Sequence, residues 1–122
     1  MAAQKILIAE DEKPMARALE IKLNKVGFET TIVFDGVAAL EELASNKYDL
    51  LLLDLMMPNK DGFSVLEDIK TKKIKVPVIV STNLNQKDDI EKAMSLGAKD
   101  YFVKSDTPIS DVVEHIKKVL GI

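Results

Sequence analysis

The chain has 122 residues, which is the length of one domain and is enough to bury a hydrophobic core without covalent cross-links. It contains no cysteine, which excludes thiol chemistry and cysteine-based zinc sites, and its hydrophobic fraction of 47% excludes extensive disorder. The formal net charge of −3, from 17 basic and 20 acidic residues, gives no overall footprint for nucleic acid. No signal-peptide pattern or membrane-length apolar run is present, so we expect a cytoplasmic protein that binds neither nucleic acid nor membrane.

Short apolar runs alternate with helix-like patterns along the chain. Continuous apolar runs predict buried strands, and apolar residues spaced three and four apart predict helices. In chain order, the prediction is a strand at residues 5–9, a helix at 14–26, a strand at 29–34, a helix that follows Asp35-Gly36, a strand at 49–54, a helix that starts near Gly62, a strand at 77–81, a helix at 86–96, a strand at 100–103 and a helix at 108–120. Gly27 and Gly97 are expected to end the helices before them.

The same periodicity predicts which helical side chains pack inward. The inward-facing residues predicted for the first two helices are Met15, Leu19, Leu23, Val26, Val37, Leu40, Leu43 and Ala44. Asn85 and Thr107 are predicted to cap the N-termini of the last two helices, with Pro108 in the first turn of the final one. His115 lies off the apolar stripe of that helix and is expected to be exposed.

Alternating strands and helices with short connections predict an α/β fold with a parallel sheet covered on both faces. Right-handed crossovers then favour a flavodoxin-like, doubly wound sheet of five strands in the order 2-1-3-4-5, with five helices. That order places the first and third strands together at the switch point, where such sheets bind ligands. We expect one domain across residues 1–122, with no linker or repeat and no output domain after the last helix of this chain.

Charged residues follow three of the predicted strands. Asp54 ends the run Leu50–Leu53, Glu10 and Asp11 end the first strand, and Lys104 ends the fifth. If the strands are parallel, these side chains meet at one edge of the sheet. Carboxylate oxygens are the ligands that Mg²⁺ prefers, and without a cation the acids would repel each other, so that some pKa values would rise.

This arrangement suits phosphoryl chemistry. Asp54 lies in the middle of the sheet and could attack a phosphoryl donor to give an aspartyl phosphate, while Lys104 supplies a compact positive charge. A hydroxyl donor is available at the end of the fourth strand, in Ser81-Thr82. The alternative interpretation is that these acids are solvated entries to loops.

Four segments together carry a resemblance to a known family. They are Ile6-Leu7-Ile8-Ala9-Glu10-Asp11-Glu12, Asp54-Leu55-Met56-Met57-Pro58 with Asp61-Gly62, Ser81-Thr82-Asn83, and Gly97-Ala98-Lys99-Asp100-Tyr101-Phe102-Val103-Lys104. In this order and spacing, the chain closely resembles a response-regulator receiver domain, the chemotaxis-regulator-like module of two-component signalling. The resemblance covers nearly the whole chain.

The resemblance implies a phosphoacceptor and a magnesium site. Asp54 resembles the residue that receives a phosphoryl group from a histidine kinase or a phosphotransfer protein. Asp11 resembles the direct Mg²⁺ ligand, Glu10 the acid that holds the ion through water, and the backbone carbonyl of Met56 the third protein ligand. Asp54 would also bind the metal ion.

The resemblance also implies a conformational switch. Thr82 matches the hydroxyl that turns toward the phosphoryl group, Tyr101 the aromatic residue that moves inward with it, and Lys104 the lysine that contacts the phosphoryl oxygen. The output would be a surface made by the last two helices and the last strand, which binds a downstream protein. Without the family pattern, Tyr101 would be an edge residue with its hydroxyl in water.

Two residues depart from the family pattern. Ser105 stands where the family usually has a proline after its lysine, often in a cis bond, which costs about 3 kcal/mol before any other residue. We therefore do not expect a cis bond there. Asn83 stands where the family prefers a small residue, and its amide could narrow access to Asp54 or hydrogen-bond the phosphoryl group. Both departures affect the expected lifetime of the phosphoryl group more than the identity of the site.

Several alternatives remain open from the residues alone. The chain could be a receiver-like docking module that is not phosphorylated, or a piece of a longer regulator with a DNA-binding output. A phosphatase with a covalent aspartate would need a second acid two residues after Asp54, and Met56 stands there, so we do not expect an enzyme beyond help with its own phosphorylation and dephosphorylation. A monomer or weak dimer is expected, and the basic run at 70–75 is interpreted as a solvated helix end.

Overall fold

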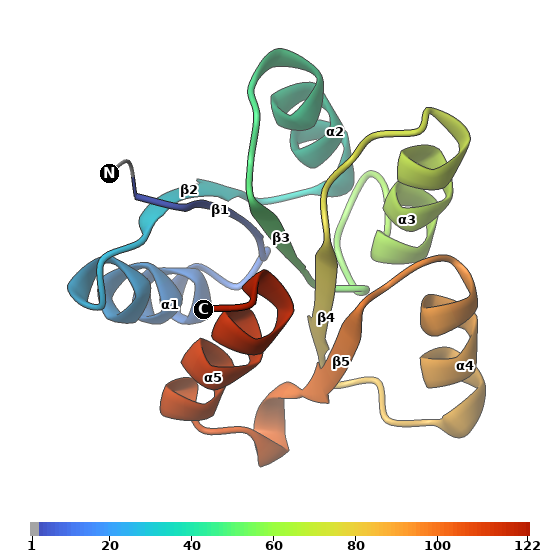
Figure 1. Cartoon of the computed structure of the whole chain (residues 1–122). Helices are drawn as coiled ribbons and strands as arrows, with labels where there is room; N and C mark the ends of the chain where they lie inside the picture. Colours follow the sequence, from blue (N-terminus) through green and yellow to red (C-terminus); the bar gives the residue numbers. More distant parts are fainter. Residues whose placement is uncertain (1–2) are drawn as a thin grey trace.

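Strands and helices alternate through the computed structural model, which describes residues 3–122 (Figure 1). In chain order they are β1 (Lys5–Ala9), α1 (Lys13–Lys25), β2 (Glu29–Val33), α2 (Gly36–Ser45), β3 (Leu50–Leu53), α3 (Gly62–Thr71), β4 (Val78–Thr82), α4 (Lys87–Ser95), β5 (Asp100–Val103), the 3-10 turn η1 (Lys104–Asp106) and α5 (Ile109–Leu120). Every predicted strand and helix is present, and η1 is an addition that the sequence pattern did not predict. In the part of the chain that is described, no helix is long and apolar enough to cross a membrane.

The five strands form one parallel sheet in the order β2-β1-β3-β4-β5, which confirms the predicted fold class and topology. In Figure 1, α1 and α5 lie on one face of the sheet, and α2, α3 and α4 lie on the other. Alternate residues of one strand serve the two faces: Leu50 and Leu52 pack with α1 and α5, whereas Leu51 and Leu53 pack toward α2, α3 and α4. Burial on both faces explains why β3 is a continuous apolar run rather than an alternating one.

The prediction of an inward-facing side chain is wrong for three residues. Val26 is exposed because α1 ends at Lys25 and Val26 is its C-cap. Val37 and Ala44 are exposed because the buried face of α2 consists of Gly36, Ala39 and Leu43. Small residues on this face allow α2 to approach the sheet and α3 closely. A prediction based on the spacing of large apolar residues does not detect a buried helix face made of glycine and alanine.

Both predicted N-caps of the last helices are also wrong. The capping position of α4 is Gln86 rather than Asn85, and that of α5 is Pro108 rather than Thr107. The predicted stops at Gly27 and Gly97 are confirmed, since their φ values of 104° and 108° lie in the left-handed region that glycine adopts without strain.

Candidate functional site

The carboxyl ends of β1, β3, β4 and β5 form the edge of the sheet where the charged residues gather. Ala9 pairs with Leu53, so the next residues, Glu10 and Asp54, leave the sheet side by side. Asp54 N–H donates to the Ala9 carbonyl at 3.0 Å, which extends the ladder by one residue and fixes the backbone of the acid. The parallel register therefore brings Glu10 and Asp54 together, as the sequence predicted.

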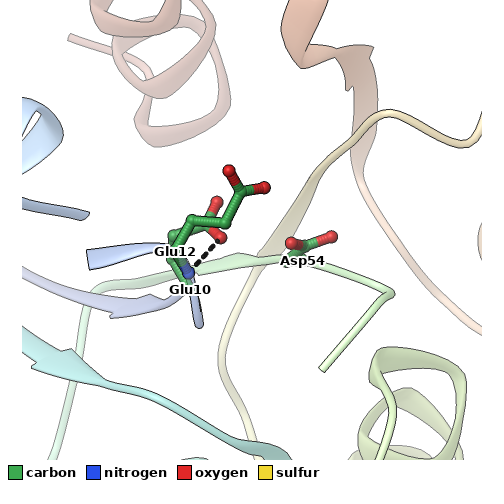
Figure 2. A group of neighbouring side chains, drawn as sticks. All are labelled: Glu10, Glu12 and Asp54. Atoms are coloured by element: carbon green, nitrogen blue, oxygen red, sulfur yellow. Dashed lines mark hydrogen bonds between the residues drawn. The ribbon is translucent and has the colours of Figure 1, made fainter. Parts of the chain in front are cut away.

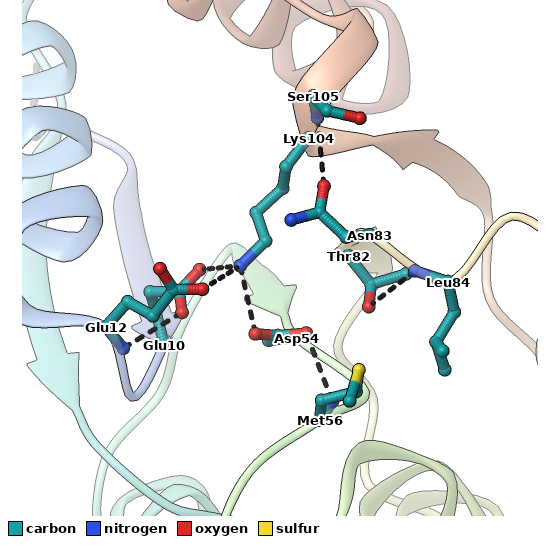
Figure 3. Close-up of polar contacts among 9 residues, drawn as sticks. All are labelled: Glu10, Glu12, Asp54, Met56, Thr82, Asn83, Leu84, Lys104 and Ser105. Atoms are coloured by element: carbon teal, nitrogen blue, oxygen red, sulfur yellow. Dashed lines mark hydrogen bonds and ion pairs between the residues drawn. The ribbon is translucent and has the colours of Figure 1, made fainter.

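Lys104 lies at the centre of this acidic group (Figure 3). Its Nζ donates to Glu10 Oε1 at 2.7 Å and to Asp54 Oδ2 at 3.0 Å, and it lies 3.5 Å from Glu12 Oε1. The side chains of Lys104, Glu10 and Asp54 are almost fully buried, whereas Glu12 is exposed. Charged groups in this position are stabilised only because they pair with each other.

Burial and mutual contact shift the pKa values of Glu10 and Lys104. Burial, together with the charge of Asp54, raises the pKa of the Glu10 carboxyl to about 7, although the hydrogen bond from Lys104 opposes the shift. Burial alone would lower the pKa of the Lys104 ammonium, but the hydrogen bonds and charges of Glu10 and Asp54 outweigh it and raise this pKa above its usual value. Lys104 therefore stays charged, and the site retains an excess of negative charge.

Three carboxylates converge closely enough to share one cation (Figure 2). Glu10, Glu12 and Asp54 each place an oxygen within 4.8 Å of the others. Asp11, the predicted direct ligand, is not among these three, but it lines the same pocket as Asp54. Glu12 was missed as a site residue, although it is the third acid of the Glu10-Asp11-Glu12 run. Hard oxygen donors in excess over the single Lys104 charge fit a magnesium ion.

The acids open into a pocket of about 650 Å³. Part of its lining is apolar and includes Met57, Phe63 and Leu84, which come from the loop after β3, from α3 and from the loop after β4. The complete lining is Asp11, Glu12, Asp54, Leu55, Met56, Met57, Asp61, Phe63, Asn83, Leu84 and Lys104. Asp54 is thus reachable by another molecule even though its own side chain is buried.

The loop after β3 is folded around the Asp54 carboxylate. Met56 N–H donates to Asp54 Oδ1 at 3.1 Å, while the Met56 side chain is 58% exposed. The turn closes where Gly62 N–H donates to the Leu55 carbonyl at 3.0 Å, at the start of α3. Asp61 caps that helix by accepting from Ser64 N–H at 2.9 Å. Asp61 therefore has the turn and capping role that its Asp-Gly sequence indicates.

The predicted switch residues lie on β4 and β5. Thr82 is fully buried, and its Oγ1 accepts a long hydrogen bond of 3.4 Å from Leu84 N–H. The Tyr101 hydroxyl donates to the Leu84 carbonyl at 2.6 Å, so it is not in water. Burial, and after it the charges of Asp89 and Asp54, raises the pKa of Tyr101 to about 12. Leu84 therefore connects the two predicted switch side chains.

The two residues that depart from the family pattern contact each other. Ser105 N–H donates to Asn83 Oδ1 at 3.0 Å, and the Lys104–Ser105 peptide bond is trans, as expected. This contact could not be predicted from the sequence, because the two residues lie on different loops.

His115 is not fully exposed, contrary to the prediction. Its ring is partly buried against Phe102, with ring centroids 5.2 Å apart, and its Nδ1 lies 2.5 Å from Asp100 Oδ2. The histidine therefore attaches α5 to β5 and lies outside the acidic pocket.

The fold and this site define a class of protein: a doubly wound sheet with a buried aspartate, acidic neighbours and a lysine at the carboxyl ends of its strands. Residues 6–117 match the family described as the response regulator receiver domain. The chain therefore belongs to the receiver domains of two-component response regulators, a family that is generally not enzymatic.

Individual relatives agree with this assignment. Response regulator ArlR of Staphylococcus saprophyticus is 37% identical over 116 residues, which is 95% of this chain and 52% of that protein. The receiver domain of the Francisella response regulator 1452 has a TM-score of 0.91 at 30% identity, with 97% of each chain covered. The receiver domain of sensor histidine kinase PA1611 from Pseudomonas aeruginosa, solved with a magnesium ion in its active-site cleft, has a TM-score of 0.88 at 28% identity and covers 99% of this chain and all of that one. The chain spans about half the length of the curated relatives it matches.

The raised pKa of Glu10 predicts how stability depends on pH. In metal-free buffer the folded protein holds a proton on Glu10 up to about pH 7, whereas the unfolded chain releases it near 4.5. The folded state binds more protons in this window, so the free energy of unfolding should fall by about 3 kcal/mol as the pH rises from 4.5 to 7.

Glu10→Gln should remove most of this pH dependence and make the metal-free protein more stable than the parent at pH 8. Urea denaturation at several pH values measures the free energy of unfolding. The matched control is Glu67→Gln, which changes an exposed acid of α3. The same slope in the parent and in Glu10→Gln would show that Glu10 is not the group responsible.

Proposed function

We propose that this chain is a phosphoacceptor, phosphorylated on Asp54 in a Mg²⁺-dependent reaction and active through partner binding. The observation that carries the proposal is the Lys104 ammonium, which joins Asp54 and Glu10 at the edge of a pocket open to another molecule. Because the Lys104 ammonium lies next to the buried Asp54, it can offset the negative charge that a phosphoryl group on Asp54 would add. The receiver fold and the curated response regulators support the same function.

The reaction follows from the position of Asp54. One carboxylate oxygen attacks the phosphorus of a phosphohistidine in a histidine kinase or phosphotransfer protein. A P–O bond to Asp54 forms, the P–N bond breaks, and the imidazole nitrogen takes up a proton from solvent and leaves as histidine. Lys104 Nζ, now 3.0 Å from Asp54 Oδ2, donates to a phosphoryl oxygen in the product and offsets the added charge.

The residues that would hold Mg²⁺ are Asp11, Asp54 and the Met56 carbonyl, with Glu10 through water. A bound ion would neutralise the acids and orient the phosphoryl oxygens. The magnesium ion in the active-site cleft of the PA1611 receiver domain supports a magnesium site in this chain. Glu12 is a further candidate, because its carboxylate lies in the same group as those of Glu10 and Asp54.

Phosphorylation would then change the surface of α4, β5 and α5. A phosphoryl group adds about −1.5 to −2 charges and offers acceptors to Lys104 and to the Thr82 hydroxyl. Thr82 Oγ1 holds Leu84 N–H only weakly, at 3.4 Å, and Leu84 in turn holds the Tyr101 hydroxyl. Movement of Thr82 toward the phosphoryl group would therefore shift Leu84, Tyr101 and the start of α4 together. This surface would bind the downstream protein. A histidine kinase partner would place the domain in the cytoplasm, and we propose that it is a monomer or a weak dimer there.

Phosphoryl uptake tests the function directly. Incubation with acetyl phosphate and Mg²⁺ should add the mass of one phosphoryl group, and peptide mapping should place it on Asp54. Omission of Mg²⁺, or the substitution Asp54→Asn, should abolish the gain. An unmodified parent protein would leave the alternative, a docking module that is not phosphorylated.

The switch has a separate test. Hydrogen exchange with and without beryllofluoride, a phosphoryl mimic, should change in residues 83–103 and in α5, and should stay constant in β2, the strand at the opposite edge of the sheet. Exchange that is identical with and without the mimic throughout α4, β5 and α5 would contradict the switch.

A further inference from the structure

The Asn83 carboxamide joins the loop after β4 to the loop after β5. Its Oδ1 accepts from Ser105 N–H at 3.0 Å, across 22 positions of the chain. Each partner is next to a predicted site residue, since Asn83 follows Thr82 and Ser105 follows Lys104. This single hydrogen bond therefore ties together the two segments that carry the hydroxyl and the ammonium of the site (Figure 3).

The Ser105 N–H also determines how the carboxamide is turned. A backbone N–H can only donate, so the amide must present its oxygen to Ser105, and its amino group must point the other way. Asn83 lines the same pocket as Asp54 and Lys104. In Figure 3, the Asn83 nitrogen lies on the side of the Lys104 ammonium, whereas its oxygen lies on the side of Ser105. The bond to Ser105 thus keeps the Nδ2 hydrogens on the pocket side.

We infer that Asn83 Nδ2 is an additional hydrogen-bond donor to the phosphoryl group on Asp54, and that Ser105 N–H is its positioning group. The inference rests on the proposed function and deepens it. A proline at position 105 would have no N–H, and the carboxamide would be free to turn its oxygen toward the phosphoryl group, where it would repel. Asn83 and Ser105 therefore act together: Ser105 orients the carboxamide, and the oriented carboxamide donates to the phosphoryl group.

The charge balance of the site explains why such a donor helps. Around Asp54, the described residues supply one buried cation, Lys104, against the acids Glu10, Asp11, Glu12 and Asp54. A phosphoryl group adds still more negative charge. The amide of Asn83 can donate to it without introducing a charge of its own, and it lies opposite the Glu10 side of the site in Figure 3. A donor to a charged oxygen should strengthen binding by about ten-fold.

The test uses the affinity of the full chain for beryllofluoride in saturating Mg²⁺, measured by fluorescence or calorimetry. Asn83→Ala should weaken beryllofluoride binding by about ten-fold. Asn83→Asp keeps the acceptor for Ser105 but loses the donor and adds a charge, so it should weaken binding at least as much. Asn85→Ala, at an exposed asparagine of the same loop, is the matched control and should bind as the parent does. The affinity for Mg²⁺ alone should not change in Asn83→Ala, which separates a phosphoryl contact from a general distortion.

Ser105 is tested by removal of its N–H. Ser105→Pro removes the N–H that Asn83 accepts from, and Ser105→Ala controls for the loss of the hydroxyl, so beryllofluoride binding should be several-fold weaker in Ser105→Pro than in Ser105→Ala. In an Asn83→Ala background, that difference should disappear. Unchanged binding in Asn83→Ala, or a loss in Ser105→Pro that persists without Asn83, would overturn the inference. Phosphorylation of the parent on Asp54 is measured independently, so a failure here is distinct from a failure of the proposed function.

Discussion

Lys104→Met is expected to slow phosphoryl uptake on Asp54 by about 100- to 1,000-fold, the usual cost of removing one donor to a developing negative charge. Methionine keeps an unbranched side chain of similar length, so the change removes mainly the ammonium group. That group is the one buried cation among the described residues of the pocket, and it contacts Asp54 and Glu10 directly. The incoming phosphoryl oxygens would then lose the ammonium donor that faces Asp54.

The same substitution should also destabilise the metal-free protein, by about 3 kcal/mol or more at pH 8, because it leaves buried carboxylates without their partner. Added Mg²⁺ should restore part of this loss, since an ion that binds only the folded state stabilises it. Acid should also restore part of it, because a protonated Glu10 carries no charge. Lys104→Met therefore has two effects, slower phosphoryl uptake and lower stability. Added Mg²⁺ or acid should restore part of the stability, which separates the two effects.

Lys60→Met is the matched control, because it removes an ammonium that pairs with Asp68 at 2.7 Å on the surface, with both side chains about 30% exposed. Phosphoryl uptake should equal that of the parent, and the free energy of unfolding should change by less than about 1 kcal/mol. Uptake is measured by mass spectrometry over time with acetyl phosphate. A Lys104→Met protein that is phosphorylated at the parental rate would remove Lys104 from the mechanism.

The sheet and its acidic edge could be predicted from the sequence because both depend on chain connectivity. The run Leu50–Leu53 is apolar at every position, which indicates burial on both faces, and short crossovers then leave few strand orders. Once the strands are parallel and in register, Glu10 and Asp54 must leave the same edge. No side-chain geometry is needed for that step.

What could not be predicted depends on how loops and helix faces meet. Glu12 reaches the site because the chain turns back after Glu10, and the local sequence does not specify that direction. The contact between Asn83 and Ser105 requires the relative position of two loops. His115 lies off the apolar stripe of α5 but finds a ring and a carboxylate on β5, in Phe102 and Asp100. Periodicity describes one helix at a time and cannot detect such partners.

Gly62→Ala is expected to damage both the fold and the phosphorylation site. A Cβ at position 62 would lie 2.4 Å from the Asp54 carbonyl oxygen and 2.7 Å from Leu55 Cα. Both are backbone atoms, so neither can rotate away, and either α3 or the end of β3 must move. The free energy of unfolding should fall by about 1–3 kcal/mol. Phosphoryl uptake should fall by at least about ten-fold, because a misplacement of 1 Å at a reacting group can cost about 100-fold.

Gly36→Ala separates these two effects. Gly36 begins α2 as Gly62 begins α3, and a Cβ there would lie 2.2 Å from the Lys60 carbonyl oxygen and 2.8 Å from Val65 Cγ2. The expected loss of stability is similar, but the displaced atoms are not those of Asp54. In a cold buffer where both variants are fully folded, only Gly62→Ala should show slow phosphoryl uptake and weak beryllofluoride binding. Equal uptake in the two variants would mean that the α3 start does not fix the position of Asp54, and that the ladder bond from Asp54 N–H to Ala9 is sufficient to hold the nucleophile in place.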